Sequence, residues 1–170
     1  MLKPVFFVSV PRVFNKIYSA LNARFSTLTG CKKYLFECGV AAKMYNLENT
    51  GTVTHCCYDR LIFKKAAAML GGNVRAIGTG GAPMEKSVSS FLKICFSCPI
   101  TDGYGMTEVS GTISKSSTED LIVDHVGGPH NLIKFRLKSL PDLNYLVTDM
   151  PYPRGELLLK GPSIFSGYFK

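Results

Sequence analysis

The chain has 170 residues, of which 46% are hydrophobic and 19% are charged, and its formal net charge is +8. This balance is typical of a globular chain with one core, and it excludes collagen, coiled-coil and low-complexity chains. The longest apolar run near the start, residues 5–10, is too short for a membrane-spanning helix or for the apolar part of a secretory signal.

Positive charge is concentrated in the first half of the chain. Residues 1–85 contain eleven Lys or Arg against four Asp or Glu, whereas residues 86–170 contain nine against eight. The excess could form a surface that attracts phosphates, nucleic acid or anionic lipid, or it could lie on solvated helix faces, and the second interpretation is favoured. The basic residues are not clustered with stacking aromatics, so we expect no nucleic-acid partner.

The cysteines are expected to be reduced and mostly buried, because no export signal accompanies them. They are Cys31, Cys38, Cys56, Cys57, Cys95 and Cys98. Cys95 and Cys98 have Cys-x-x-Cys spacing, but no second pair completes a four-sulfur zinc site, so neither metal nor redox chemistry is favoured there. For His55, beside Cys56 and Cys57, solvation is favoured over metal ligation.

The first predicted elements are a strand and an amphipathic helix. Residues 5–10 are short, β-branched and aromatic, which predicts a buried strand that Pro11 stops. Pro11 then opens a helix whose apolar residues recur at three- and four-residue spacing, namely Phe14, Ile17, Leu21 and Phe25. We expect this stripe to face the core.

Two further helices are predicted before the next strand. Residues 31–47 favour a helix, and residues 46–54 read as a polar loop. A third helix is expected over residues 59–70, with Asp59 near its start and Gly71-Gly72 as its stop.

Two strands then end in glycine-rich segments. Residues 74–79 predict a strand that runs into Gly-Gly-Ala-Pro at 80–83, and a helix follows over residues 84–94. A further strand over residues 98–101 runs into a glycine-bearing loop over 102–108. Because ligands collect at the carboxyl ends of parallel strands, the two loops are expected to lie side by side and to share one ligand.

The last part of the chain is predicted to be rich in strands. Apolar and basic residues alternate from Ile133 to Lys138, which is typical of a half-buried strand, and residues 156–160 favour another. The sequence therefore predicts an α/β fold with a mainly parallel sheet, helices and a strand-rich C-terminal part.

The second glycine-bearing loop carries groups suited to a nucleotide. Tyr104 lies between two glycines, which let the backbone approach a flat ligand closely. Thr107 offers a hydroxyl and Glu108 a carboxylate, and Mg²⁺ prefers one or two carboxylates together with phosphate oxygens. Taken alone, these residues favour a simpler interpretation, in which Glu108 caps a helix or pairs with a surface lysine and Tyr104 is a core aromatic.

Three motifs in order resemble those of the AMP-forming adenylating enzymes. They are Tyr-Gly-Met-Thr-Glu at 104–108, preceded by Gly-Gly-Ala-Pro at 80–83 and followed by Gly-Glu-Leu-Leu-Leu-Lys-Gly-Pro at 155–162 with Gly-Tyr at 167–168. Segments 10–13, 59–65, 70–75 and 125–129 make the chain most similar to long-chain acyl-CoA synthetases. The resemblance covers residues 5–170.

The resemblance implies a nucleotide site and a metal ligand. The residues expected around the nucleotide are Gly81, Ala82, Pro83, Asp102, Gly103, Tyr104 and Thr107. Tyr104 is expected to lie on the adenine ring. Thr107, at the α-phosphate, and Glu108, as the Mg²⁺ ligand, are the residues expected to serve catalysis.

The resemblance also implies an acyl side of the site. The residues expected near the acyl group are Gly105, Met106, Gly127 and Gly128. The implied substrates are a fatty acid, ATP and coenzyme A, which react through an acyl-adenylate to give acyl-CoA, AMP and pyrophosphate. An intracellular location is implied, in the cytoplasm or peripherally at a membrane such as the endoplasmic reticulum.

The match to the family pattern is incomplete. The resemblance implies that residues 1–170 are one incomplete AMP-binding domain, the central fragment of the large N-terminal domain of a longer synthetase. The family's phosphate loop, its ribose-binding acid and the lysine of its small C-terminal domain are absent, so we expect the fragment alone to be inactive. The alternative is a non-catalytic nucleotide-binding or interaction module derived from the same fold.

Overall fold

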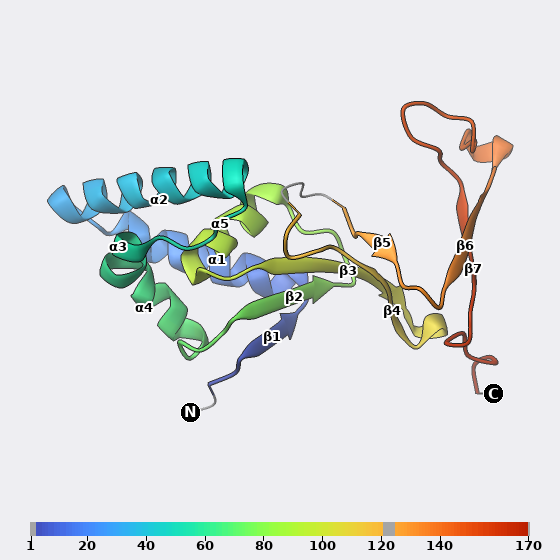
Figure 1. The fold of residues 1–170 in the computed structure, drawn as a ribbon, viewed down its shortest axis with the longest axis horizontal. Helices are drawn as coiled ribbons and strands as arrows, with labels where there is room; N and C mark the ends of the chain where they lie inside the picture. Colours follow the sequence, from blue (N-terminus) through green and yellow to red (C-terminus); the bar gives the residue numbers. More distant parts are fainter. Residues whose placement is uncertain (1–2, 121–124, 170) are drawn as a thin grey trace.

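Helices and strands alternate through the first two thirds of the chain in the computed structural model, which describes residues 3–120 and 125–169 (Figure 1). The elements of this part are β1 (Phe6–Ser9), α1 (Pro11–Ser26), α2 (Gly30–Thr50), α3 (Cys56–Tyr58), the π-helical turn η1 (Asp59–Phe63), α4 (Lys64–Ala67), the 3-10 turn η2 (Ala68–Leu70), β2 (Ala76–Gly80), α5 (Lys86–Phe96) and β3 (Ile100–Met106). The rest comprises the 3-10 turn η3 (Thr107–Val109), β4 (Gly111–Lys115), β5 (Gly128–Pro129), β6 (Lys134–Lys138), the 3-10 turn η4 (Pro141–Leu143) and β7 (Glu156–Lys160).

The strands of the described residues form two sheets. The larger has the order β1-β2-β3-β4-β5, in which β1, β2 and β3 are parallel, whereas β4 runs antiparallel to both β3 and β5. The smaller is the antiparallel pair β6 and β7. The predicted α/β class, with its parallel strands and strand-rich C-terminal part, is confirmed.

The first helix follows the sequence prediction. Pro11 occupies its first turn, where its missing N–H removes no helical hydrogen bond. Phe14 and Leu21 are fully buried, and Ile17 and Phe25 pack against the same core. The predicted apolar stripe is therefore confirmed.

The second helix is longer than predicted. It continues to Thr50 and ends at Gly51, which adopts the left-handed conformation with φ of 70°. The prediction of a loop over residues 46–54 is wrong for its first five residues. The helix ends at Gly51 rather than at the polar residues that begin at Asn46, because glycine reaches the left-handed conformation without a Cβ clash.

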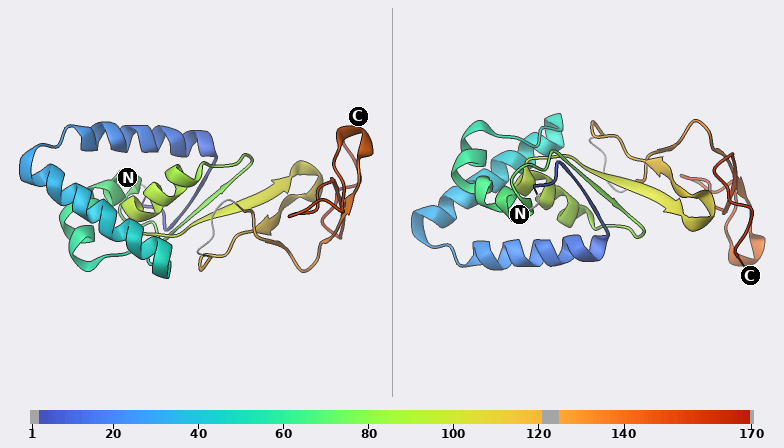
Figure 2. Two further views of the ribbon diagram at one scale, coloured as in Figure 1. Left: turned by 90° about the horizontal axis from the view of Figure 1, so that it is seen from above. Right: turned by 90° about the horizontal axis from the view of Figure 1, so that it is seen from below.

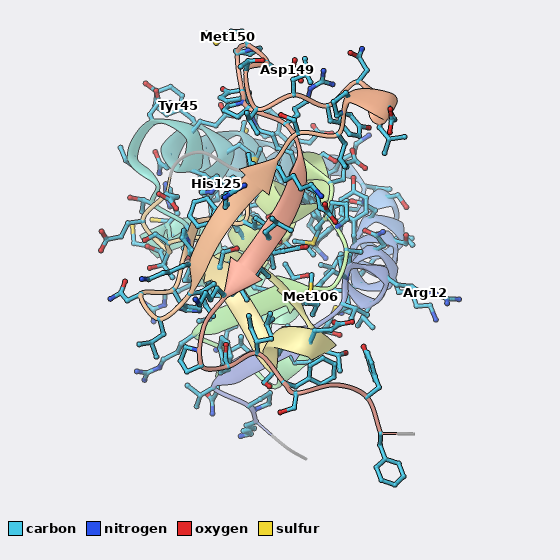
Figure 3. The ribbon with its side chains drawn as sticks, turned by 90° about the vertical axis from the view of Figure 1, so that its right-hand side faces the viewer. Arg12, Tyr45, Met106, His125, Asp149 and Met150 are labelled. Carbon is cyan, nitrogen blue, oxygen red and sulfur yellow. The ribbon has the colours of Figure 1, made fainter. Side chains whose placement is uncertain are left out.

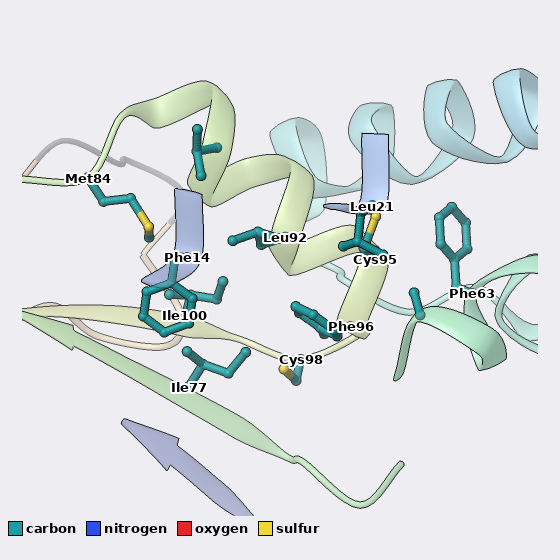
Figure 4. Packing of buried hydrophobic residues seen from close by; sticks show 12 residues of the cluster. Phe14, Leu21, Phe63, Ile77, Met84, Leu92, Cys95, Phe96, Cys98 and Ile100 are labelled. Carbon is teal, nitrogen blue, oxygen red and sulfur yellow. The ribbon is translucent and has the colours of Figure 1, made fainter. Parts of the chain in front are cut away.

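The main core lies between the helices and one face of the large sheet (Figure 4). Phe14 and Leu21 of α1, Leu92 of α5 and Ile77 of β2 are fully buried in it. The helices gather at one end of the molecule and the β6–β7 hairpin lies at the other, an arrangement that Figures 1 and 2 both show.

The first strand is not buried as predicted. Phe7 packs edge-on against Phe14 in the core, but Phe6 is 53% exposed and Val8 is 64% exposed. The reason is that β1 lies at the edge of the sheet and the helices cover only one of its faces. A sequence pattern of continuous apolar residues indicates two buried faces, and here one of them is bare.

A buried lysine joins three helical elements. The Lys43 ammonium, from α2, bonds to the Asp59 carboxylate, donates to the Ile94 carbonyl at 2.5 Å and donates to the Ser97 hydroxyl at 2.7 Å. It also lies 4.5 Å from the centre of the Phe63 ring. Burial lowers the pKa of Lys43, and the Asp59 carboxylate opposes this shift.

The cysteines differ from the expectation. Cys95 and Cys98 are buried, Cys38 is half-buried, and Cys31, Cys56 and Cys57 are exposed, all of them free thiols. The expectation of mostly buried thiols is wrong because the exposed three lie at or near the start of surface helices. Burial raises the pKa of Cys98 to about 11 and raises that of Cys95 as well, so neither forms a reactive thiolate at neutral pH.

The β6–β7 hairpin rests on a second, smaller cluster. Val109, Ile113 and Ile133 are its buried residues, and Leu159 of β7 packs against them. The loop between the two strands extends away from this contact, and Met150 near its tip is 87% exposed (Figure 3). Among the described residues, no helix is both long enough and apolar enough to cross a bilayer.

Candidate functional site

A pocket of about 300 Å³ lies at the ends of β2 and β3. It is lined by Gly81, Ala82, Pro83, Met84, Asp102, Gly103, Tyr104, Gly105, His125 and Val126. The two segments meet because β2 and β3 are parallel neighbours, with Gly80 paired with Gly103. The prediction that both glycine-rich segments lie side by side at one sheet edge is confirmed.

The segment after the second parallel strand is not a loop. Residues 102–106 continue β3 and pair with β4, with a bulge between Tyr104 and Gly105. A Cβ atom at Gly105 would collide with the Gly111 carbonyl of β4, so the glycine permits a backbone approach that no other residue allows. The prediction of a loop over 102–108 is therefore wrong for residues 102–106, which are strand. The chain leaves the strand at Thr107, where the turn η3 begins.

Tyr104 lies on the wall of the pocket and is 36% exposed. The bulge beside it changes the register of the strand and aims its side chain differently from those of a regular ladder. The neighbouring backbone is fixed, because the Asp102 N–H donates to the Ser116 hydroxyl at 2.9 Å and the Ser116 N–H donates to the Asp102 carbonyl at 2.8 Å. An aromatic ring is thus presented from a rigid strand.

A larger, shallower groove adjoins this pocket along the bare face of the sheet. Its volume is about 600 Å³, and Gly81, Gly103 and Gly105 line both hollows. Met106 and Thr107 line the groove and not the pocket. Thr107, one of the residues predicted around the nucleotide, therefore lies outside the pocket that gathers the other six, in the adjoining groove with Met106.

Glu108 lies in η3 and lines neither hollow. Its carboxylate accepts a hydrogen bond from the Tyr168 hydroxyl at 2.7 Å, and its carbonyl accepts one from the Phe165 N–H at 3.0 Å. The Tyr168 hydrogen bond lowers the pKa of Glu108, so the carboxylate is ionised at neutral pH. The sequence motif contained Tyr168, but nothing in the sequence assigned it to Glu108.

The segment after residue 124 closes the pocket on a second side. His125 and Val126 line it, and the His125 ring accepts the Gly127 N–H at 3.0 Å through Nδ1. Gly127 lines a small neighbouring hollow that also contains Tyr104, whereas Gly128 pairs with Lys115 at the sheet edge. No sequence signal assigned His125 to the pocket, although it lies two residues before Gly127.

The pocket is large enough for a small flat ligand, and Asp102 is the acidic residue among those that line it. Its volume is at the small end of the range for small-molecule sites. The family model described as AMP-binding enzyme matches residues 1–169. The chain belongs to the AMP-binding enzyme family. The pocket of this AMP-binding chain lies between two segments, 81–84 and 102–105, that include residues of the motifs at 80–83 and 104–108.

The curated relatives of this AMP-binding chain include long-chain acyl-CoA synthetases. It is 41% identical over 170 residues to "Long chain acyl-CoA synthetase 7, peroxisomal" of Arabidopsis thaliana, and the match covers 100% of the chain and 24% of the relative. It is 37% identical to "Fatty acyl-CoA synthetase A" of Dictyostelium discoideum, with 100% and 25% covered. The chain therefore spans about a quarter of the length of these relatives.

Solved structures of the same fold include adenylation domains. The A domain of carboxylic acid reductase from Segniliparus rugosus, in complex with AMP and a co-purified carboxylic acid, matches with a TM-score of 0.62 and 26% identity over 99% of the chain and 22% of the domain's chain. The adenylation domain of a carboxylate reductase from Mycobacterium chelonae matches with a TM-score of 0.70 and 24% identity over the same shares. These matches agree with the α/β architecture described above.

Proposed function

We propose that this chain forms the nucleotide-binding part of an ATP-dependent long-chain fatty acid–CoA ligase. The observation that carries the proposal is the pocket in which Gly81–Pro83 and Asp102–Gly105 meet in an AMP-binding chain. The 41% identity to a long-chain acyl-CoA synthetase over the whole chain supports the substrate class. The related A domain bound to AMP and a carboxylic acid supports the pairing of nucleotide and acid.

In this proposal the adenine ring lies in the pocket against Tyr104. Stacking on an aromatic ring is worth about 1–3 kcal/mol for a base. Backbone groups of Gly81, Ala82 and Pro83 border the ring on one side, and those of Asp102 and Gly103 border it on the other. The apolar walls and the few polar groups of the pocket suit a flat heterocycle.

The phosphates then extend toward η3, where Thr107 and Glu108 lie. The Thr107 hydroxyl contacts the α-phosphate in this proposal. The ionised, half-buried Glu108 carboxylate fits a Mg²⁺ site, because Mg²⁺ takes one or two carboxylates together with phosphate oxygens. When bound, Mg²⁺ neutralises phosphate charge.

The proposed reaction has two displacements. A fatty-acid carboxylate oxygen attacks the α-phosphorus of ATP and pyrophosphate leaves, giving the acyl-adenylate. The thiol of coenzyme A then attacks the activated carbonyl and AMP leaves. The chain's residues serve by positioning the substrates and by stabilising charge. In this proposal the acyl group lies beside Gly105 and Met106 in the groove, and Gly127 and Gly128 border it on its other side.

The proposal extends to the rest of the enzyme and its surroundings. Residues 1–170 form one incomplete AMP-binding domain, and the phosphate loop, the ribose acid and the adenylating lysine come from other segments of the enzyme. A peripheral contact with an intracellular membrane is part of the proposal, supported by the basic first half of the chain and by a fatty substrate.

The direct test is Glu108→Ala in the full-length enzyme. Fatty-acid-dependent exchange of pyrophosphate into ATP should fall by about 100-fold or more, because a charge-stabilising group at the phosphates is lost. Glu48→Ala, an exposed carboxylate on α2, is the matched control and should retain the wild-type rate. Exchange that survives unchanged in Glu108→Ala would refute the metal-ligand role.

Nucleotide binding is tested separately from turnover with Tyr104→Ala. Loss of ring stacking should raise the Kd for AMP about 5- to 150-fold, as measured by isothermal titration calorimetry. Tyr45→Ala, which removes an exposed ring from α2, should leave the Kd unchanged. Equal affinities in the two variants would contradict the adenine site, and tight AMP binding without pyrophosphate exchange in the wild type would favour the non-catalytic module.

A further inference from the structure

Three metal-ligating side chains lie together at the start of the helical segment that α3 begins. His55, Cys56 and Cys57 each offer one donor atom, and the three atoms lie within 4.8 Å of one another. Both thiols are free and exposed, and their sulfurs are 3.6 Å apart. The cluster lies away from the nucleotide pocket, which is built from residues 81–84, 102–105 and 125–126.

The separations match a single tetrahedral cation. Zn–S bonds of about 2.3 Å at a tetrahedral angle separate two sulfurs by about 3.8 Å, close to the 3.6 Å found here. Zn–N bonds of about 2.0–2.1 Å require a nitrogen at a similar distance from each sulfur, within the 4.8 Å that contains the three donors.

The histidine is available for coordination. Its ring rests against Tyr58, with the ring centres 4.6 Å apart. Its Nδ1 is shielded from water and has no hydrogen-bond partner among the described residues, so no neighbour already engages the imidazole at that atom. A neutral imidazole with two thiolates is a donor set that zinc and other soft or borderline cations prefer.

Hydrogen bonds to Asp59 fix the backbone of this turn to the core. The His55 N–H donates to the Asp59 carboxylate at 2.8 Å. The same carboxylate bonds to the buried ammonium of Lys43, which is also tied to the end of α5. The cluster is therefore fixed to the folded core, which reduces the ordering cost of binding an ion.

We propose that His55, Cys56 and Cys57 bind one zinc ion or a similar thiophilic divalent cation. Binding releases the two thiol protons to solvent, and three protein ligands leave the fourth position to water or to another donor. The site shares no residue with the nucleotide pocket, and Figure 1 shows α3 at the helical end of the molecule. Its expected effect is to stabilise the turn between α2 and η1.

The test is a titration of the purified full chain with Zn²⁺, kept reduced by a non-thiol phosphine, and a parallel titration with Co²⁺ as a spectroscopic probe. One ion per chain and a sulfur-to-cobalt charge-transfer band are expected. The Cys56→Ser/Cys57→Ser double variant should lose one equivalent of metal and the band. The Cys31→Ser/Cys38→Ser double variant, which removes one exposed and one half-buried thiol from α2, should retain both.

A second measurement needs no variant and so does not depend on whether one folds. Saturating Zn²⁺ should protect Cys56 and Cys57 of the wild-type chain from alkylation by iodoacetamide, as read by mass spectrometry, whereas Cys31 should react equally with and without the metal. The proposal is overturned if Zn²⁺ fails to protect the pair. It is also overturned if the folded Cys56→Ser/Cys57→Ser variant binds metal with wild-type stoichiometry and affinity.

Discussion

The contact between Tyr168 and Glu108 joins two residues that are 60 positions apart in the chain. The phenol donates to the carboxylate at 2.7 Å, and this hydrogen bond lowers the pKa of Glu108 and raises that of Tyr168. Tyr168 is exposed and Glu108 is half-buried near the surface, so the bond orients the carboxylate rather than stabilising the fold strongly. Tyr168 is thus a positioning residue for the proposed metal ligand.

Replacing Tyr168 by Phe removes the donor and should raise the pKa of Glu108 toward its ordinary value of about 4.3. Since the pKa is depressed in the folded chain, the stabilising effect of the bond is present above the unfolded pKa and is lost as the pH falls through the folded pKa. In Tyr168→Phe the carboxylate should therefore protonate at higher pH. An NMR titration of the Glu108 side-chain carboxyl measures the shift.

The control for this titration is Tyr152→Phe, which alters an exposed phenol in the loop between β6 and β7. It should leave the Glu108 titration unchanged. An identical Glu108 pKa in both variants would mean that the Tyr168 hydroxyl does not bond to the carboxylate in solution.

At the residue scale the sequence predicted which segments meet at the pocket but not the contacts of their side chains. Gly81, Asp102 and Tyr104 do gather in one pocket, because parallel strand ends dictate that proximity. The Tyr168 contact and the position of His125 depend on how a distant hairpin and a loop fold back. No local spacing rule contains that information.

The helices are connected by the Lys43 ammonium rather than by apolar packing alone. It links α2 with Asp59 of η1 and with the carbonyl of Ile94 in α5. Burying a charge is unfavourable unless partners satisfy it, and here a carboxylate, a carbonyl and a hydroxyl do so. Removing the lysine would take this donor from the Ile94 carbonyl and the Ser97 hydroxyl and the opposite charge from the Asp59 carboxylate.

Lys43→Met is therefore expected to lower the free energy of unfolding by about 3–5 kcal/mol, because it leaves the partly buried Asp59 carboxylate unpaired. Urea unfolding of the chain, followed by circular dichroism, measures this. Lys33→Met is the matched control: its ion pair with Glu37 is exposed at 3.9 Å and should be worth less than about 1 kcal/mol. Equal urea midpoints for the two variants would argue against the buried link.

Element boundaries followed the sequence where one physical cause dominated. The stripe of α1 and the strand over residues 156–160 were predicted closely, because helical periodicity determines the first and the second is a short apolar run. The end of α2 and the extension of β3 to Met106 were not. The first depended on which residue stops the helix, and the second on pairing with β4, which the local sequence does not reveal.

For the whole molecule, the bare face of the large sheet is the main departure from a closed fold. Phe6 and Val8 stand exposed on it, and β1 is an edge strand that, among the described residues, pairs with β2 alone. Exposed edges and apolar faces promote association between chains. The sequence predicted strand β1 but not which of its faces would be covered, because coverage depends on the arrangement of all the helices.

The 170-residue chain is therefore expected to self-associate in solution, and Val8→Lys should weaken that association roughly tenfold, since burial of a valine is worth about 1.5 kcal/mol or more. Sedimentation equilibrium gives the association constants. Tyr45→Lys changes an equally exposed side chain on α2 and should have no effect. A strictly monomeric wild-type chain would contradict this prediction.

The division of the apolar residues into two clusters has a consequence for local opening. The cluster under the hairpin has three buried residues, one of which, Val109, directly follows Glu108, while the main cluster has many more. Fluctuations that detach the hairpin need only disrupt the smaller cluster, so its amide hydrogens should exchange with solvent before those of β2 and β3. The carboxylate proposed to hold the metal thus sits beside the cluster expected to open first, while the adenine wall belongs to the strands expected to open later.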